Sequence, residues 1–400
     1  MLLYWIWFSL LKNLPLWKKK AMLQYFSDPE EIYFADPAAF EKVPDMTEDT
    51  LKALEEKDLQ ESEKILNACG AKNIGVLPLA DSRYPERLRN IDDPPVVLYY
   101  RGVLPEWDAQ PFIGVVGTRK ATAYGLQQAF RLGKQISQCG GVVVSGGAFG
   151  IDSKSMQGAI EAERPVVGVL GCGVDVVYPR TNRHLFNRTA EYGCLLSEYP
   201  PGEAPLPWHF PQRNRIISGI CHGVLVVEAP QKSGALITAQ FACQQGRDVY
   251  AVPANLGVDA YEGNNGLLAQ GFPAVRDGWD AVKAYENLYP QTVAKYSGIS
   301  PSGGETTPLK VAQKPVIPEK VQKISIDNRE KSTYSVINSG GSALTEEERK
   351  VLALISRHPV HSDTVAENSE LPPSKVQSIL TKLTLKGLVQ HHSGGRVSLK

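Results

Sequence analysis

Short apolar runs that alternate with stretches of helical periodicity limit the fold of this chain more than any other feature. The runs are FIGVVG, GVVVSG, PVVGVLG, CLLSEY, GVLVVEA and DVYAVPA, all between residues 112 and 254, with a weaker seventh run, FPAV, after them. Each run is apolar at consecutive positions, which is typical of strands covered on both faces. The pattern predicts an α/β fold over residues 69–290, an extended Rossmann-like domain with a doubly wound parallel sheet.

Three further segments flank this domain. Residues 1–68 predict several short helices broken at prolines, similar to SAM or helix-hairpin-helix modules, which either contact DNA backbones or pack against other parts of a protein. Residues 291–340 are rich in Ser, Gly, Pro and Lys and predict a flexible linker. Residues 341–400 predict three helices and two strands around Gly394-Gly395, the pattern of a winged helix that binds either DNA or a protein.

The charge balance excludes attraction of the whole surface to a polyanion. The chain has 43 basic and 43 acidic residues, so a nucleic-acid site must be a local cluster. Its six cysteines form no CxxC pair and have no histidine at metal-ligand spacing, which favours buried thiols over a metal site or disulfides. The N-terminal run MLLYWIWFSLL is shorter than a membrane span and its basic residues follow it, so we expect a first helix, no membrane segment and a cytoplasmic protein.

The carboxyl ends of the predicted strands carry glycine-rich turns and basic side chains. Ligands of open α/β sheets bind at this edge. The stretch VSGGAFGID joins a strand to a helix through glycines, and the amides of such a joint face negative charge. Several basic positions along one edge predict a site for phosphates in series. The candidate phosphate-binding residues are Arg119, Lys120, Ser145, Gly146, Gly147, Arg180, Asn182, Arg183, Arg213, Asn214 and Arg215.

Sequence signatures of catalysis or of a bound cofactor are missing. There is no G-x-G-x-x-G after the first strand, no Walker loop, no G-x-S-x-G elbow and no HExxH. Asp152 follows the glycine loop and is expected to cap the helix that begins there, rather than to act as a general base. Glu198 and Glu228 end strands and are expected to orient neighbouring arginines. We therefore expect a binding protein without catalytic residues, cofactor or metal.

The motifs at this edge resemble the DNA-processing protein A (DprA/Smf) family. They are VVGTRKATAYG, VSGGAFGID, GCGVDVVYPRTNRHL and the long stretch LLSEYPPGEAPLPWHFPQRNRIISGICHGVLVVEA. The resemblance implies a protein that binds and protects incoming single-stranded DNA and helps to load RecA on it during natural transformation and homologous recombination. It also implies a homodimer built on the Rossmann domain, contact with single-stranded DNA-binding protein as a further partner, and strand binding by Arg119 and Arg180.

The chain departs from the family pattern at three places. Phe149 stands where the family usually has arginine, Ser155-Met156 where it has Ala-His, and Pro253-Ala254 where it has Pro-Gly. Phe149 is expected to be a core residue, although an exposed ring at that position could stack on a base.

Two other functions remain open from the sequence. The glycine loops also resemble those of enzymes that release the base of a nucleoside monophosphate, although the stretch SGALITAQ lacks the acidic residue that such enzymes carry there. The second of these alternatives is an adaptor whose winged helix docks a partner protein.

A cleft at the edge of a sheet accepts one splayed DNA backbone and excludes a double helix. For the DNA-binding function we therefore expect a preference for single strands over duplex.

Overall fold

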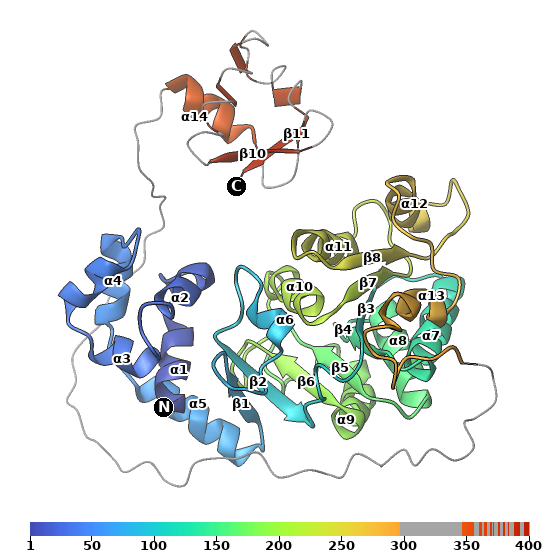
Figure 1. Ribbon diagram of the computed structural model, residues 1–400, viewed down its shortest axis with the longest axis horizontal. Coiled ribbons are helices and arrows are strands. Elements are labelled where there is room, and N and C mark those ends of the chain that lie inside the picture. Colours follow the sequence, from blue (N-terminus) through green and yellow to red (C-terminus); the bar gives the residue numbers. More distant parts are fainter. Residues whose placement is uncertain are drawn as a thin grey trace. The chain divides into compact units, whose positions relative to one another are not determined.

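The computed structural model divides the chain into two compact units, Met1–Val321 and Gln322–Lys400, and each is described by itself (Figure 1). It describes residues 1–296 and parts of 346–400, with gaps between these parts. Residues 297–340 of the predicted linker and the predicted wing turn at Gly394-Gly395 lie outside the described residues, so both stay predictions.

An eight-stranded sheet forms the centre of the first unit. Its strand order is β1-β2-β6-β5-β4-β3-β7-β8. The six strands from β6 to β8 in this order are parallel, and β2 pairs antiparallel with both β1 and β6. The strands are β1 (Gly75–Pro78), β2 (Val97–Gly102), β3 (Phe112–Val116), β4 (Val142–Ser145), β5 (Val166–Val169), β6 (Cys194–Ser197), β7 (Gly223–Val226) and β8 (Asp248–Ala251).

The six apolar runs of the sequence form the six parallel strands, so the predicted doubly wound α/β fold is confirmed. The antiparallel strands β1 and β2 were not predicted. They lie outside the alternation of strands and helices that identified the others. The strand order reverses between β3 and β7, where Val116 pairs with Val226 in parallel register. This is the topological switch point, the place where ligands bind in open α/β sheets.

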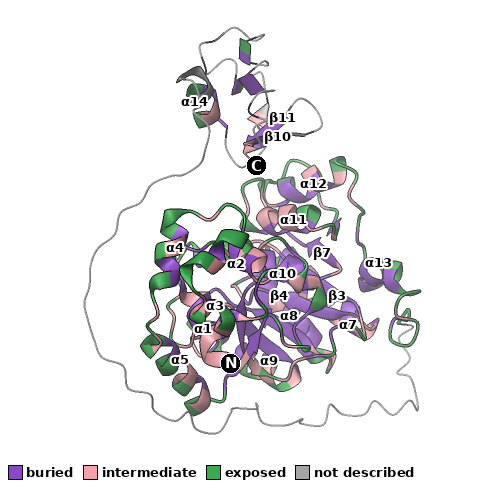
Figure 2. Cartoon of the chain, turned by 60° about the vertical axis from the view of Figure 1, so that its left-hand side comes forward, coloured by how far each residue is buried: buried purple, intermediate pink, exposed green. Residues whose placement is uncertain are grey.

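Helices cover both faces of the sheet, as the consecutive apolar positions predicted. In β3, Phe112 and Val116 belong to the core beneath α10 and α11, whereas Ile113 and Val115 belong to the core beneath α7, α8 and α9. Figure 2 shows the strands buried between these layers. The covering helices are α7 (Ala123–Gln138), α8 (Ile151–Glu161), α9 (Arg183–Tyr192), α10 (His209–Ile220) and α11 (Gly234–Gln244), with α6 (Glu86–Arg89) beside α10 and α12 (Glu262–Ala269) and α13 (Gly278–Val282) after β8.

The N-terminal helices share a hydrophobic core with the sheet. The run MLLYWIWFSLL forms α1, as predicted, and its Trp5 and Phe8 pack in the same core as Leu77 of β1 and Tyr99 of β2. The helices are α1 (Leu2–Leu10), α2 (Leu16–Met22), α3 (Pro29–Phe34), α4 (Glu48–Glu55) and α5 (Gln60–Ala71). No helix among the described residues is long and apolar enough to cross a membrane.

Three consecutive lysines of α2 donate hydrogen bonds to backbone carbonyls of neighbouring segments. Lys18 Nζ donates hydrogen bonds to the carbonyls of Pro44 and Asp45, at 2.7 and 2.8 Å. Lys19 Nζ donates to the carbonyl of Ser9 at 2.8 Å, and Lys20 Nζ donates to that of Ile91 at 2.6 Å. The run therefore ties α2 to three other segments of the chain, because each ammonium group donates to carbonyls of a loop or, at Ser9, of the last turn of α1.

The buried Lys19 gives the free energy of unfolding a dependence on pH. Burial lowers the pKa of Lys19 to about 7, against the opposing charge of Glu198. In the unfolded chain a lysine has a pKa of about 10.4. Between the pKa values of Lys19 in the folded and unfolded states, the unfolded chain therefore binds more protons than the folded one. The free energy of unfolding should therefore rise with pH over this range, and Lys19→Met should flatten the rise.

Urea titrations at several pH values test this prediction. Lys52→Met is the matched control, because Lys52 has 63% of its side chain exposed and pairs only with Glu48 of its own helix. The control should keep the slope of the parent. If Lys19→Met kept it as well, the lysine would not be the source of the pH dependence.

The second unit combines a helix with a small antiparallel sheet. α14 (Glu346–Ala353) precedes β9 (Val360–His361), β10 (Val389–His392) and β11 (Arg396–Leu399), which are ordered β10-β11-β9. Val351, Val389 and Val397 share a small core of their own. The two final strands were predicted, whereas β9 was not.

Candidate functional site

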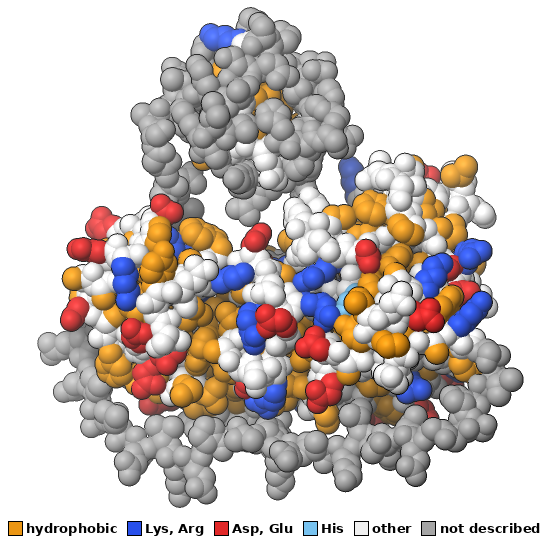
Figure 3. Space-filling view, viewed as in Figure 1, with side chains coloured by type: hydrophobic (Ala, Val, Ile, Leu, Met, Phe, Trp, Pro, Cys, Tyr) orange, Lys and Arg blue, Asp and Glu red, His pale blue; other side chains and the backbone are white. Residues whose placement is uncertain are grey.

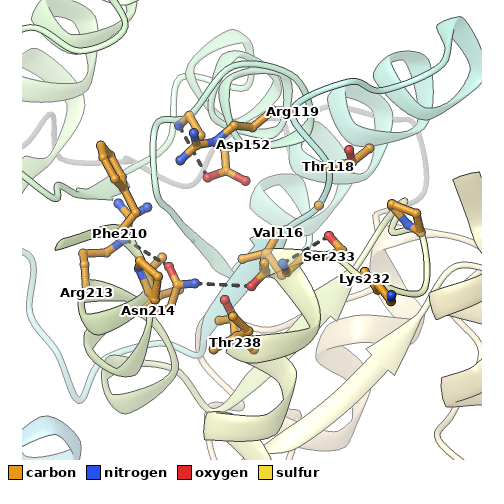
Figure 4. Close-up of a pocket in the computed structure, with 18 of the residues that line it drawn as sticks. Val116, Thr118, Arg119, Asp152, Phe210, Arg213, Asn214, Lys232, Ser233 and Thr238 are labelled. Atoms are coloured by element: carbon orange, nitrogen blue, oxygen red, sulfur yellow. Dashed lines mark hydrogen bonds between the residues drawn. The ribbon is translucent and has the colours of Figure 1, made fainter. Parts of the chain in front are cut away.

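A pocket of about 360 Å³ opens at the carboxyl ends of β3 and β7, at the topological switch point (Figure 4). The segment after β3 supplies Thr118 and Arg119, and the segment after β7 supplies Lys232 and Ser233. α10 contributes Arg213 and Asn214 from the side, and the first turn of α8 contributes Asp152. The pocket thus brings together three of the predicted residues, Arg119, Arg213 and Asn214.

A buried carboxylate holds the segment that presents Arg119. Glu228 is 0% exposed and follows β7; its two oxygens accept hydrogen bonds from the Thr122 amide at 2.8 Å and the Thr122 hydroxyl at 2.7 Å. The Thr122 hydroxyl in turn caps α7 by accepting a hydrogen bond from the Gly125 amide. Glu228 therefore positions the β3–α7 loop through Thr122. Among the described residues it pairs with no arginine, so the expectation that Glu228 orients one was wrong.

The glycine loop after β4 lies behind the pocket. Ser145 Oγ donates to the carbonyl of Val115 at 2.6 Å, so it joins two strands rather than facing a ligand. Gly147 has a φ of +63°, and Asn182 Nδ2 donates to its carbonyl at 3.0 Å. A Cβ atom at Gly146 would overlap the Arg213 guanidinium and the Asp152 carboxylate. The loop requires glycine because these two side chains approach its backbone closely.

Arg213 is a fixed, buried part of the pocket wall. It has only 3% of its surface exposed, and Nη1 donates to the carbonyls of Gly146 and Val169. Burial lowers the pKa of Arg213 to about 10, against the favourable charge of Asp152. Nη2 donates to no protein group in the described residues. The side chain therefore keeps a donor for a ligand while its position is set by the backbone.

Arg215 lies two residues further along α10 and has a different environment. Its Nη1 and Nη2 donate to the two carboxylate oxygens of Glu198 at 2.8 and 2.7 Å, and Nε lies 3.1 Å from Asp93 Oδ2. Its side chain is 4% exposed. The guanidinium is engaged within the protein, so we do not propose Arg215 as a ligand for phosphate. Glu198 orients an arginine, as the sequence predicted.

The remaining predicted residues lie outside the pocket. Arg180 and Arg183 are exposed at the turn that leads from β5 into α9, and Lys120 is exposed beside Arg119. Asn182 is buried between the two arginines and supports the glycine loop instead. On the face shown in Figure 3, basic and acidic side chains are interspersed, in keeping with the balanced charge of the sequence.

The sequence reasoning missed Lys232, which lines the pocket next to the N-terminus of α11. Ser233 caps this helix by accepting a hydrogen bond from the Ala235 amide. The signal was present in the stretch APQKSG, a lysine directly before a helix start at the end of a strand. An eleven-residue helix whose first turn lines the pocket adds positive potential to that of the basic side chains.

Two sequence expectations about single residues were wrong. Phe149 was expected in the core, yet 60% of its surface is exposed next to the pocket residue Ala148. Asp152 was expected to cap α8, yet Gly150 occupies the cap position and no side chain bonds there. Met156, which stands where the family usually has histidine, is fully buried in the core. This departure from the family pattern is therefore a difference in core packing.

Aromatic rings lie around the mouth of the pocket. The Arg119 guanidinium lies 5.0 Å from the centroid of the Phe210 ring, and the ring of Tyr178 lies 5.5 Å from the same centroid. Trp208, beside the pocket residue Pro207, is 59% exposed. Such rings next to arginines are the side chains on which unpaired bases stack.

Comparison with known proteins identifies the family. Residues 75–286 match the model of DNA recombination-mediator protein A, and residues 339–395 match the DprA winged helix domain. The chain belongs to the DNA recombination-mediator protein A family. This confirms the resemblance stated from the sequence motifs and the winged helix at the C-terminus.

Individual relatives agree with this assignment. The chain is 31% identical to protein Smf of Synechocystis, over 98% of this chain and 97% of that protein. It is 43% identical to DNA processing protein DprA of Bacillus subtilis, over 58% of this chain and 77% of that protein. The structure of DprA from Streptococcus pneumoniae matches with a TM-score of 0.59 and 31% identity, over 69% of this chain and 94% of that one.

The buried pair of Arg215 and Glu198 should contribute strongly to stability. In Glu198→Gln, the amide group of the new side chain would face guanidinium donors, which leaves part of a buried cation unpaired. We expect the free energy of unfolding to fall by about 3 kcal/mol. Denaturant titration measures it. Glu48→Gln removes a carboxylate from an exposed pair with Lys52 and should change little. Equal effects in both variants would contradict the prediction.

Proposed function

We propose that this protein binds single-stranded DNA at the switch-point pocket and the exposed basic residues beside it. The observation that carries the proposal is the convergence of Arg119, Arg213 and Lys232 with the start of α11 at the carboxyl edge of the sheet. Basic side chains together with a helix N-terminus form a site for phosphate. Membership of the DNA recombination-mediator family supports DNA as the source of that phosphate.

The size of the pocket favours a single strand over a duplex. A volume of about 360 Å³ holds one nucleotide or less of a chain, and its walls come from α10, the starts of α8 and α11, and the loops between these elements. A duplex cannot present one splayed backbone to such a site. The exposed rings of Phe149 and Trp208 offer faces for unpaired bases, which a duplex keeps stacked on one another.

The strand would continue from the pocket along the exposed arginines. Arg119 belongs to the pocket, Arg180 is exposed at the turn before α9, and Arg183 is exposed as the first residue of α9. These positions follow strands β3 and β5, whose carboxyl ends lie at the same sheet edge. With a net charge of zero, the attraction to DNA is local to this edge.

The wider role follows from the family. We propose that the bound strand is protected and that RecA is loaded on it during natural transformation and homologous recombination. We further propose a homodimer that aligns two pockets on one strand, with single-stranded DNA-binding protein as an additional partner. Family membership supports these steps.

A double variant, Arg119→Ala with Arg180→Ala, should weaken binding of a labelled oligonucleotide. Two phosphate contacts would be lost, so the slope of log affinity against log salt should fall by about 1.4. Fluorescence anisotropy at several salt concentrations measures this slope. The pair Lys52→Ala with Lys64→Ala removes the same charge from exposed positions of α4 and α5 and serves as the control. Parent-like binding of the arginine variant at every salt concentration would exclude this edge as the DNA site.

Stacking on Phe149 can be tested separately from phosphate binding. Phe149→Ala should cost about 1–3 kcal/mol of binding free energy with an oligonucleotide and much less with an abasic strand of the same length. Phe34→Ala is the matched control, because Phe34 is an exposed phenylalanine of α3. An equal loss of affinity for both strands would contradict stacking.

A nucleotide-processing enzyme is the second candidate. It is favoured by Asp152, a buried carboxyl group in a pocket that also holds two arginines. Incubation with nucleoside monophosphates, followed by chromatography for free base, separates the two functions. Base release by the parent that is lost in Asp152→Asn would support the enzyme and contradict a pure binding role.

A further inference from the structure

Asp152 is an acidic residue in a pocket that we propose for phosphate. It lies in the first turn of α8, lines the pocket, and has only 6% of its surface exposed. In Figure 4 its carboxylate lies beside Arg119, and the dashed line marks the hydrogen bond that Oδ2 accepts from the Ala148 amide at 3.4 Å. A carboxylate at this place opposes the entry of an anion.

The fold does not require the charge of Asp152. Gly150 occupies the N-cap of α8, and no side chain caps the helix. Among the described residues, Asp152 forms no ion pair within 4.0 Å, although the charges of Arg213 and Arg119 act on it from further away. Helix start and pocket wall could both form around a neutral side chain of the same shape. The charge is therefore available for a role toward the ligand.

Two cations and two amides face the carboxyl group. Arg213 comes from α10 and Arg119 from the loop after β3, and the amides of Gly146 and Ala148 come from the glycine loop. Lys232 lines the same pocket from the segment after β7. Burial raises the pKa of Asp152, although Arg213, the Ala148 amide, Arg119 and the Gly146 amide each oppose the rise. The free-energy difference between the neutral and the ionised form of Asp152 is thus smaller than for an exposed aspartate.

We propose that Asp152 is a specificity-determining residue, which takes up a proton from solvent when a phosphodiester enters the pocket and then donates a hydrogen bond to it. The inference rests on the proposed strand binding. A phosphate bound by the two arginines partly neutralises the positive charge that stabilises the ionised carboxylate of Asp152. It also places a negative charge beside that carboxylate. Both effects favour the neutral carboxyl group in the complex.

The same charge selects against small anions. A phosphodiester carries one negative charge, whereas the terminal phosphate of a free nucleotide carries close to two at neutral pH. The ionised carboxylate of Asp152 repels the terminal phosphate of a nucleotide more strongly than it repels a phosphodiester. The carboxylate must be neutralised before such a phosphate binds tightly. The pocket of the parent would therefore favour the interior of a strand over the free nucleotides that compete for it.

The sign of the pH dependence follows from proton uptake. If the complex holds Asp152 protonated and the free protein holds it ionised, affinity for the strand rises as the pH falls, by up to about tenfold per pH unit. The rise occurs between the pKa values of the free and bound protein, and it ends below the lower one. In Asp152→Asn the side chain is neutral throughout, so this part of the pH dependence disappears.

Two measurements on the full chain test the proposal. The first is the affinity for a thymidine oligonucleotide between pH 5 and 8.5 at constant ionic strength. Asp152→Asn should bind on the order of tenfold more tightly than the parent at the alkaline end, and equally at the acid end. The second is calorimetry in two buffers of different ionisation enthalpy. The parent should take up close to one proton per pocket, and the variant none.

Glu161→Gln is the matched control, since it removes a carboxylate from the end of the same helix, where 62% of the side chain is exposed. It should keep the affinity, the pH slope and the proton uptake of the parent. Thermal unfolding of each variant shows whether it is folded. Competition by a nucleoside monophosphate should be stronger in Asp152→Asn than in the parent.

The outcomes distinguish this proposal from strand binding itself. If the parent bound no oligonucleotide, the proposed function would fail. If it bound but Asp152→Asn kept the pH slope and proton uptake of the parent, only the role of Asp152 would be overturned. A change in preference among homopolymers with an unchanged slope would likewise overturn it, because the carboxylate would then contact a base and not a phosphate.

Discussion

The reversal of strand order between β3 and β7 is the constraint on which the rest of the site depends. Their parallel register brings the ends of the two strands together at Val116 and Val226, and the connections leave in opposite directions. This divergence opens the pocket. Glu228, two residues after the end of β7, holds the loop after β3 through Thr122, so the two sides of the pocket are fixed to one another by a buried carboxylate.

Arginine has two different uses around this pocket. Arg213 and Arg215 are buried, and their guanidinium groups bind backbone carbonyls or carboxylates of the protein. Arg119 and Arg180 are exposed and have their charge available at the surface. The buried arginines fix the pocket wall, and in the proposed complex the exposed ones would supply attraction to DNA that salt screens. Changing Arg215 should therefore affect folding, and changing Arg213 should affect both the pocket wall and the proposed phosphate binding. Changing Arg119 or Arg180 should affect how the proposed DNA binding depends on salt.

Apolar contacts hold the N-terminal helices to the sheet, and hydrogen bonds hold α2 to α1 and to neighbouring loops. Trp5 and Phe8 enter the core over β1 and β2, and Lys18, Lys19 and Lys20 donate to carbonyls of three segments. The proton that Lys19 binds or loses links this packing to pH. The ammonium groups of this basic run are hydrogen-bonded within the protein, so the run does not form part of the proposed DNA site.

The sequence by itself determined the six parallel strands, the helices between them and the glycine loop, because apolar runs and glycines act through local backbone preferences and burial. It also predicted basic residues at the carboxyl edge of the sheet, of which Arg119 and Arg213 line the pocket, but it missed Lys232. Tertiary structure alone decided that Arg213 and Arg215 are buried, that Phe149 is exposed and that Asp152 lines the pocket. These outcomes depend on which side of a helix or loop meets a segment distant in sequence. β1 and β2 were missed for the same reason, since their pairing with β6 is the contact that makes them strands.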